Sequence, residues 1–72
     1  MEMYQRIRNT REDKDLNQKQ IAEILKTTQQ QYGRYELGER ELPIHHLKTL
    51  CIYYNLSADY LIGLIDEPRR LK

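Results

Sequence analysis

Residues 17–38, which read NQKQIAEILKTTQQQYGRYELG, decide the fold. Asn17 at their start and Gln20 three residues later have the spacing of a capping box, which begins a helix. Apolar residues follow at helical spacing for two turns. Thr28 opens the same pattern again, and a glycine suited to a helix end closes it. The stretch therefore predicts two short helices, one after Asn17 and one over residues 29–37, joined by a tight turn.

Three further helices are expected around this pair. Residues 4–14 have apolar or long side chains on one side, as in an amphipathic helix. Pro43 suits the first position of a later helix that Asn55 ends, and Ser57 would cap a last one. The expected core stripes of these last two helices are Leu47, Leu50, Cys51 and Tyr54, then Leu61, Leu64 and Ile65. With no strand pattern present, the predicted fold class is all-α, a compact five-helix bundle with a central helix-turn-helix.

Length and composition limit the number of domains and the compartment in which the protein is found. Seventy-two residues make one domain, expected over residues 1–66, with 67–72 as a flexible C-terminal tail because no apolar period continues there. The single cysteine, Cys51, has no partner for an internal disulfide, which fits a reducing compartment. No apolar run approaches the roughly 20 residues that cross a bilayer, and the first residues lack a signal-peptide pattern. We therefore expect a cytoplasmic protein.

Charge placement matters more than net charge here. Twelve Lys and Arg against eleven Asp and Glu give a net charge of +1, which supports a polyanionic partner only weakly. On the helix expected over residues 29–37, however, Gln29, Gln30, Gly33 and Arg34 share one outward face. Amide side chains match the N6 and N7 groups of adenine in the major groove, and Arg binds guanine or phosphate. A helix face that is merely solvated has the same composition.

The wider pattern resembles the Cro/repressor-type (XRE) helix-turn-helix family, and above all the short lambdoid phage repressor domains. The resemblance covers residues 4–65 and is carried by LNQKQIAEIL at 16–25, TTQQ at 27–30, YELGER at 35–40, Pro43 and NLSADYLIG at 55–63. It implies a lambda-repressor-like domain that binds double-stranded DNA sequence-specifically through the major groove. It also implies a small bacterial or phage transcriptional regulator acting as a repressor, in the bacterial nucleoid or a phage-infected cell.

The resemblance assigns a role to each matching position. The residues implied to contact bases are Gln29, Gln30, Gly33 and Arg34. The residues implied to contact the DNA backbone are Asn17, Gln18, Thr28, Arg11 and Arg40, with Gln18 contacting either a phosphate or the first base. The family also pairs an Arg of its first helix with the Glu that ends its third, and Arg11 and Glu36 hold those positions. This pair is either purely structural or also presents Arg11 to a phosphate.

Five residues depart from the family pattern. Gly33 stands where a larger polar reader is usual and costs the helix about 1 kcal/mol relative to Ala, so the backbone approaches DNA closely or specificity is reduced. Lys26 replaces a frequent turn glycine and Thr10 a usual leucine, each at some cost in stability. Glu39 and Glu41 place acidic charge where a strong DNA binder has Lys or Arg. We therefore expect modest non-specific affinity.

Apolar residues outside the expected core predict assembly. Ile52 faces away from the stripe of its helix, and Ile62 lies outside the stripe of the next one. The family often pairs through its C-terminal helices. A symmetric homodimer, at least on DNA, is therefore expected on a pseudo-palindromic operator, with a contact around Ile52, Ile62 and Ile65.

Enzyme chemistry finds no support in the sequence. His45 and His46 are adjacent on a helix and point about 100° apart, and Cys51 is the only other soft ligand, so one chain cannot complete a zinc site. Neither a glycine-rich phosphate loop nor a nucleophile with a matching base is present. We expect no catalysis, metal, cofactor, membrane contact or small-molecule ligand. The near-neutral charge, Gly33 and the two loop glutamates keep a second class open, a protein-interaction module of the antitoxin or antagonist type with weak or lost DNA binding.

Overall fold

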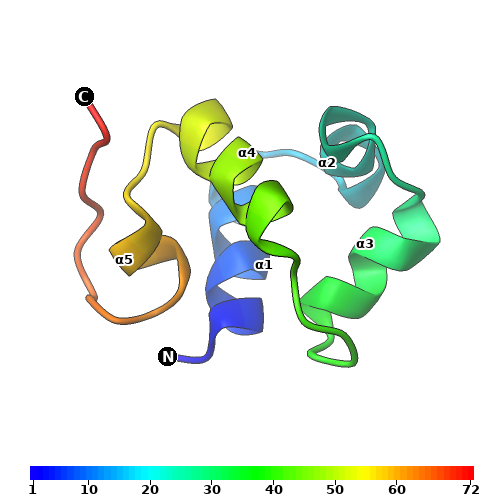
Figure 1. Cartoon of the computed structure of the whole chain (residues 1–72), viewed down its shortest axis with the longest axis horizontal. Coiled ribbons are helices and arrows are strands. Elements are labelled where there is room, and N and C mark those ends of the chain that lie inside the picture. The colour runs from blue at the N-terminus through cyan, green and yellow to red at the C-terminus, as the bar shows by residue number, and fades with distance from the viewer.

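Five helices and no strand make up the computed structural model, which describes residues 1–72 (Figure 1). The helices are α1 (Met3–Asp13), α2 (Gln18–Leu25), α3 (Gln29–Glu36), α4 (Ile44–Tyr54) and α5 (Ala58–Leu61). Figure 1 shows α1 and α4 in the middle of the molecule, with the α2–α3 pair on one side and α5 with the C-terminal segment on the other. The predicted all-α class with a central helix-turn-helix is confirmed.

The starts of α2 and α3 follow from their capping residues. Asn17 Oδ1 accepts a hydrogen bond from the Gln20 amide at 2.8 Å, and Gln20 Oε1 accepts one from the Asn17 amide at 2.8 Å. This reciprocal pair satisfies two amides that the first turn leaves free. Thr28 Oγ1 accepts from the Gln31 amide at 3.0 Å, but the Gln31 side chain donates to the Tyr35 hydroxyl at 3.3 Å instead of returning to Thr28. Only half of the second capping box therefore forms.

The turn between α2 and α3 depends on a left-handed residue. Lys26 adopts φ 59° and ψ 42° after the last residue of α2. A side chain in this conformation costs about 1 kcal/mol or more, which explains why a glycine is favourable at such a turn. The turn is short enough to hold α3 across α2 as one rigid unit, and α2 and α3 pack directly against each other.

The core lies among all five helices. Eleven buried apolar or aromatic residues form one cluster: Ile7, Ile21, Ala22, Leu25, Tyr32, Tyr35, Leu50, Cys51, Tyr54, Leu56 and Leu61. Tyr32 is completely inaccessible to solvent, and burial raises its pKa far above the usual value for tyrosine. Its neighbour Tyr35 meets it edge-on with ring centroids 6.4 Å apart. The inner side of α3 is thereby fixed, and the opposite side remains free.

The last helix is shorter than the sequence predicted. α5 has a single turn and ends at Leu61, with Ile62 as its C-cap, because Gly63 follows with φ 86° and turns the chain away. A β-carbon at residue 63 would overlap the carbonyl oxygen of Met1, so the close approach of the N-terminus to the segment after α5 also requires glycine. Leu64 is consequently 74% exposed, and the prediction that it belongs to the buried stripe is wrong.

The segment after α5 packs back on the start of that helix. Ser57 holds the N-cap position, as predicted, but its hydroxyl makes no capping bond. The Ser57 amide instead donates to the carbonyl oxygen of Arg69 at 2.6 Å, and the Arg69 guanidinium lies 3.6 Å from the Asp59 carboxylate. Residues 67–72 form no helix.

Arg6 on α1 binds the C-terminal part of the chain through hydrogen bonds. It is only 4% exposed, and its Nη1 donates to the carbonyl oxygens of Tyr60 at 2.6 Å and Ile65 at 2.9 Å. Its guanidinium also stacks on the Tyr60 ring, 3.9 Å from the centroid. The role of Arg6 could not be predicted from the sequence, because a buried arginine on an amphipathic helix has no pattern of its own.

Candidate nucleic-acid interface

The two sides of α3 differ sharply in exposure. Tyr32, Tyr35 and Glu36 are buried against the rest of the molecule. Gln29, Gln30 and Arg34 are exposed on the other side, with the half-buried Gly33 between them. The four residues predicted from the sequence to face outward are therefore brought together on one rigid helix. Such a face can donate and accept hydrogen bonds along the edges of bases.

The beginnings of α2 and α3 present further donors. The side-chain oxygens of Asn17 and Thr28 are occupied by capping bonds, while the side-chain nitrogen Nδ2 of Asn17 and the hydroxyl hydrogen of Thr28 remain available. Both residues are exposed. The first-turn amides and the positive end of each helix dipole favour an anion at these places.

A buried ion pair lies directly behind the α3 face. Arg11 Nε donates to Glu36 Oε2 at 2.7 Å and Arg11 Nη2 donates to Glu36 Oε1 at 3.0 Å, while Nη1 donates to the Leu16 carbonyl oxygen at 2.8 Å. The side chains are 12% and 2% exposed. Burial alone would raise the pKa of Glu36, but the hydrogen bonds from Arg11 and Gln18 outweigh it and lower that pKa. Arg11 is thus largely committed to Glu36.

Gln18 joins this pair from α2. Its Nε2 donates to Glu36 Oε1 at 3.0 Å. A β-carbon on Gly33 would lie 3.4 Å from Gln18 Oε1 and 3.9 Å from Nε2, so the amide rests over the bare backbone of Gly33. The sequence predicted a role for each of these residues separately, but gave no sign that Gln18, Gly33 and Glu36 meet.

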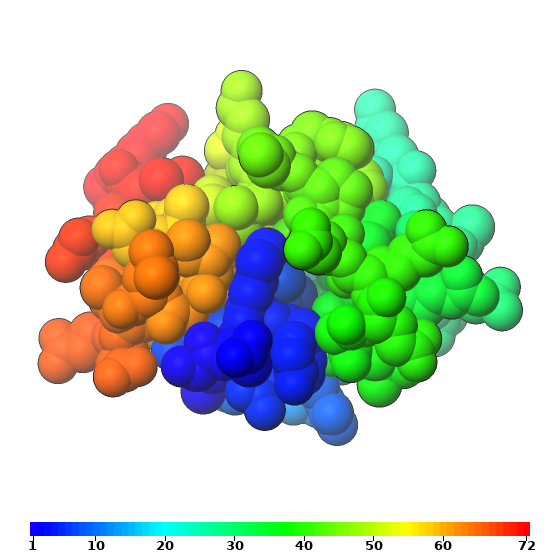
Figure 2. All heavy atoms as spheres, turned by 60° about the horizontal axis from the view of Figure 1, so that its bottom comes forward, coloured from blue at the N-terminus to red at the C-terminus, as the bar shows by residue number.

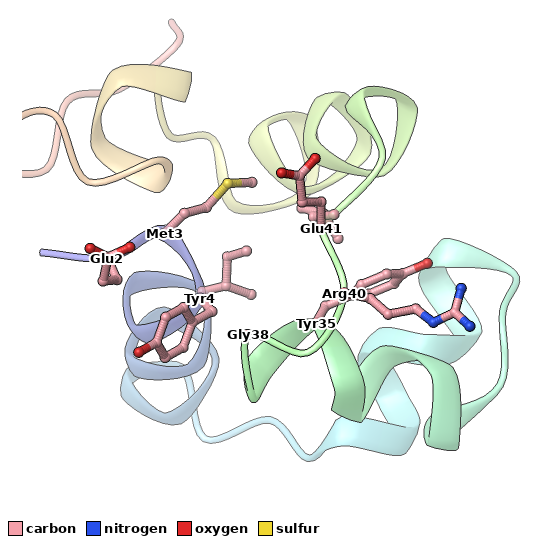
Figure 3. A pocket seen from close by; sticks show the side chains of 9 residues that line it. Glu2, Met3, Tyr4, Tyr35, Gly38, Arg40 and Glu41 are labelled. Atoms are coloured by element: carbon pink, nitrogen blue, oxygen red, sulfur yellow. The ribbon is translucent and has the colours of Figure 1, made fainter.

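The loop after α3 carries mixed charge. Glu39, Arg40 and Glu41 are all exposed, and neither Arg34 nor Arg40 forms an ion pair within the molecule. Figure 3 shows Arg40 extending from this loop away from α1. Both free guanidinium groups are therefore available to an anion, while the two glutamates oppose one.

A cavity of about 300 Å³ lies between the start of α1 and this loop (Figure 3). Tyr4, Ile7 and Tyr35 form its apolar wall, while Glu2 and Glu41 lie at its edge. In the space-filling view of Figure 2, the N-terminal segment lies between the α5 region and the loop after α3. The cavity contains none of the exposed α3 residues and has no concentration of one charge that would select a ligand.

The remaining titratable residues form no second site. The His45 and His46 rings are 4.2 Å apart, and burial together with His45 lowers the pKa of His46. Burial also raises the pKa of the Cys51 thiol, which disfavours the reactive thiolate. No group of three or more His, Cys, Asp and Glu side chains is arranged to hold a metal ion. No helix combines the length and the apolar character needed to span a membrane.

The residues expected at a dimer contact differ in exposure. Ile52 on α4 is 63% exposed and its neighbour Tyr53 is 47% exposed. Ile62 and Ile65 are half-buried within the segment that Arg6 holds. The structure therefore leaves Ile52 as the most accessible of the three.

Known proteins share this domain type. Residues 4–67 match the family described as a helix-turn-helix domain. The uncharacterized HTH-type transcriptional regulator YobD of Bacillus subtilis (strain 168) is 37% identical over 67 residues, which cover 92% of this chain and 60% of YobD. From the same organism, the SPbeta prophage-derived uncharacterized HTH-type transcriptional regulator YonR is 33% identical over 58 residues, 81% of this chain and 54% of YonR.

A solved structure is similar as well. The crystal structure of a transcriptional regulator from Listeria innocua matches with a TM-score of 0.84 and 29% identity, over 92% of this chain and 62% of that one. The chain thus spans less than two thirds of each of these relatives.

Proposed function

Because this chain belongs to the helix-turn-helix domain family, we propose that it binds double-stranded DNA sequence-specifically, with α3 in the major groove, and acts as a transcriptional repressor. The observation that carries the proposal is the exposed polar side of α3, held rigidly by the buried Tyr32 and Glu36 on its other side. The two Bacillus subtilis relatives are described as HTH-type transcriptional regulators, which supports the same function.

Gln29 and Gln30 are the proposed base readers. Both are exposed, and both lie at the start of α3, the end that enters the groove first in helix-turn-helix proteins. Gln31, the third glutamine of the run, is instead tied to Tyr35. Each free amide offers one donor and one acceptor in the arrangement that adenine requires. Arg34, one turn further along, is proposed to bind a guanine or a phosphate.

Phosphate contacts are proposed to fix the register. Asn17 and Thr28 supply side-chain donors beside the first-turn amides of α2 and α3, and Arg40 supplies a charged group from the next loop. Arg11 holds Glu36 with two hydrogen bonds and the Leu16 carbonyl oxygen with a third, so its main contribution is to orient that carboxylate. Any phosphate contact by Arg11 would use its remaining N–H groups.

Two further proposals concern assembly and place of action. Two copies would bind a pseudo-palindromic operator as a homodimer, with Ile52, Ile62 and Ile65 at the contact. The protein would act in the cytoplasm of a bacterium or of a phage-infected cell, where its DNA is found.

A protein-interaction module is the second candidate. The exposed Glu39 and Glu41 and the net charge of +1 favour it, because both weaken attraction to phosphates. An antitoxin-like or antagonist role would use the same domain surface with weak or lost DNA binding.

Selection from a random duplex library at low salt separates the two candidates. A DNA-binding regulator should enrich one sequence family with two related half-sites. The Gln29→Ala/Gln30→Ala variant, altered only at exposed positions, should lose that enrichment while keeping its helical circular dichroism spectrum. Failure of the unaltered protein to enrich any sequence would contradict the proposed function and favour the interaction module.

A further inference from the structure

The exposed side of α3 has one position without a side chain of its own. Gly33 contributes no side chain there, and the space above its backbone is taken by the amide of Gln18 from α2. The closest approach, 3.4 Å from the position of a Gly33 β-carbon to Gln18 Oε1, is an ordinary van der Waals contact. A side chain from the first helix of the pair thereby lies across the second.

The orientation of this amide is set from behind. Glu36 Oε1 accepts a hydrogen bond from Gln18 Nε2 at 3.0 Å, and Arg11 fixes that carboxylate with bonds of 2.7 and 3.0 Å. An ionised carboxylate only accepts hydrogen bonds, so the nitrogen of Gln18 must face Glu36 and the oxygen must face the α3 backbone. Gln18 retains its Oε1 lone pairs and one N–H for an outside partner.

We propose that Gln18 and Gly33 form one recognition unit, in which the Gln18 amide reads a base edge at the place that a side chain of residue 33 would otherwise occupy. Gly33 is a positioning residue in this unit, since it acts by leaving room. The inference rests on the proposed function, and it decides between the two roles, phosphate or base, that the resemblance leaves open for Gln18. One free acceptor and one free donor match adenine better than any other base.

The geometry predicts different effects for small and large groups at residue 33. The methyl group of Ala fits beneath the amide at van der Waals distance and leaves Gln18 in place. A Leu side chain branches one bond further out, where the Gln18 amide lies, and must displace it. Neither substitution offers a hydrogen bond of its own to DNA, but an apolar side chain can contact the methyl group of thymine. The double variant with Gln18→Ala therefore separates an effect through Gln18 from a direct effect of residue 33.

The test uses binding to the best duplex from the library and to variants with each base pair replaced. Gln18→Ala should reduce discrimination at one base pair by roughly tenfold, the size of one bidentate contact, and leave the preference at all others unchanged. Gly33→Leu should lose discrimination at the same base pair, while Gly33→Ala should keep it. In a Gln18→Ala background, Gly33→Leu should cause no further loss of discrimination at that pair. Thermal melts of all variants confirm folding.

Several results would overturn the inference. Equal weakening on every duplex by Gln18→Ala would make Gln18 a phosphate contact. A loss from Gly33→Leu that is the same with and without Gln18 would mean a direct clash with DNA. A change in preference caused by Gly33→Ala would show that residue 33 itself faces the base. An unaltered protein that prefers no sequence refutes the proposed function and this inference with it, whereas the other three outcomes leave that function intact.

Discussion

Glu36 links three helices through one carboxylate. It is 4% exposed at the end of α3, and it accepts hydrogen bonds from Arg11 on α1 and Gln18 on α2. A buried ion pair is no guarantee of net stability, but removal of one partner leaves the other charge unpaired in a place where water cannot replace it. Substitution of Glu36 is therefore expected to destabilise the fold, although Glu36 is not part of the apolar core.

Glu36→Ala should lower the free energy of unfolding by about 3 kcal/mol, because it leaves the Arg11 guanidinium and the Gln18 side-chain amide without their acceptor. Glu23→Ala, which replaces an exposed glutamate on α2, is the matched control. It should change the free energy of unfolding by less than about 0.5 kcal/mol. Urea denaturation of both variants measures the difference. Equal midpoints would contradict the role of Glu36.

The pH dependence of stability should report the same residue. The pKa of Glu36 is lowered in the folded state, so the unfolded state binds more protons near the usual pKa of glutamate, and stability falls as the pH decreases through that range. The contribution of Glu36 is fully present above about pH 5 and is lost as the pH falls through its lowered folded-state pKa. The melting temperature of the unaltered protein should therefore decrease more steeply over this interval than that of Glu36→Gln. Parallel curves would show that other carboxylates dominate.

The side chains of Gln29 and Gln30 affect DNA binding and not folding. Each is exposed and outside the core, so Gln29→Ala and Gln30→Ala should leave the melting temperature unchanged within error. Each should weaken binding to the selected duplex by about 1–3 kcal/mol and relax the preference at its own base pair. Fluorescence anisotropy with matched and substituted duplexes gives both values. A stability loss without a change in preference would assign these residues to the fold.

At the scale of elements, α5 depends on its neighbours. A four-residue helix is far too short to form alone, since nucleation costs more than one turn returns. Leu61 buries its side chain in the core, and Arg6 binds the carbonyl oxygens of Tyr60 and Ile65 on either side of the helix end. Leu61 in the core and Arg6 of α1 therefore hold the C-terminal part in place together.

Arg6→Met should destabilise the domain by about 2 kcal/mol or more, because two carbonyl groups lose a charged donor while the apolar stem is largely retained. Amide hydrogen exchange should accelerate mainly between residues 57 and 66. Arg8→Met, which removes only an exposed pair with Glu12 in which Nε lies 3.6 Å from Oε2, should have little effect. Exchange that accelerates uniformly in Arg6→Met would mean that the segment does not open separately.

At the scale of the molecule, apolar side chains remain exposed on several elements, including Leu37 at the end of α3 and Ile44 at the start of α4. Ile52 and Tyr53 are exposed on α4, and Leu64 is exposed after α5. Single exposed aliphatic residues are common, but the adjacent Ile52 and Tyr53 on a small domain favour association. A second copy bound by two-fold symmetry would place two α3 helices about one turn of DNA apart.

The protein should therefore sediment as a dimer on a duplex with two half-sites, with Ile52→Glu reducing cooperativity without altering affinity for a single half-site. Analytical ultracentrifugation at tens of micromolar, with and without DNA, tests this. Lys48→Glu, a charge change at another exposed position of α4, is the control. A protein that fills two half-sites independently would rule out the dimer.

The sequence by itself determined the local structure and the type of domain. Asn17 forms its capping box and Asn55 ends α4, both as predicted. Each of these features depends on neighbours three or four residues away. The exposed face of Gln29, Gln30, Gly33 and Arg34 followed from helical periodicity alone. Membership in a helix-turn-helix family agrees with the resemblance and with the expectation of a protein that is not an enzyme.

Only the tertiary structure decided the contacts between distant segments. Arg6 meets Ile65 across 59 positions and Gln18 meets Glu36 across 18, distances over which periodicity carries no information. The error at Leu64 has the same origin, because Gly63 ends α5 where the backbone of Met1 approaches it. Local hydrogen bonds and side-chain spacing determine where helices begin and which side is apolar. Packing of whole helices determines which buried polar groups meet, and so where the amide of Gln18 lies on the α3 surface.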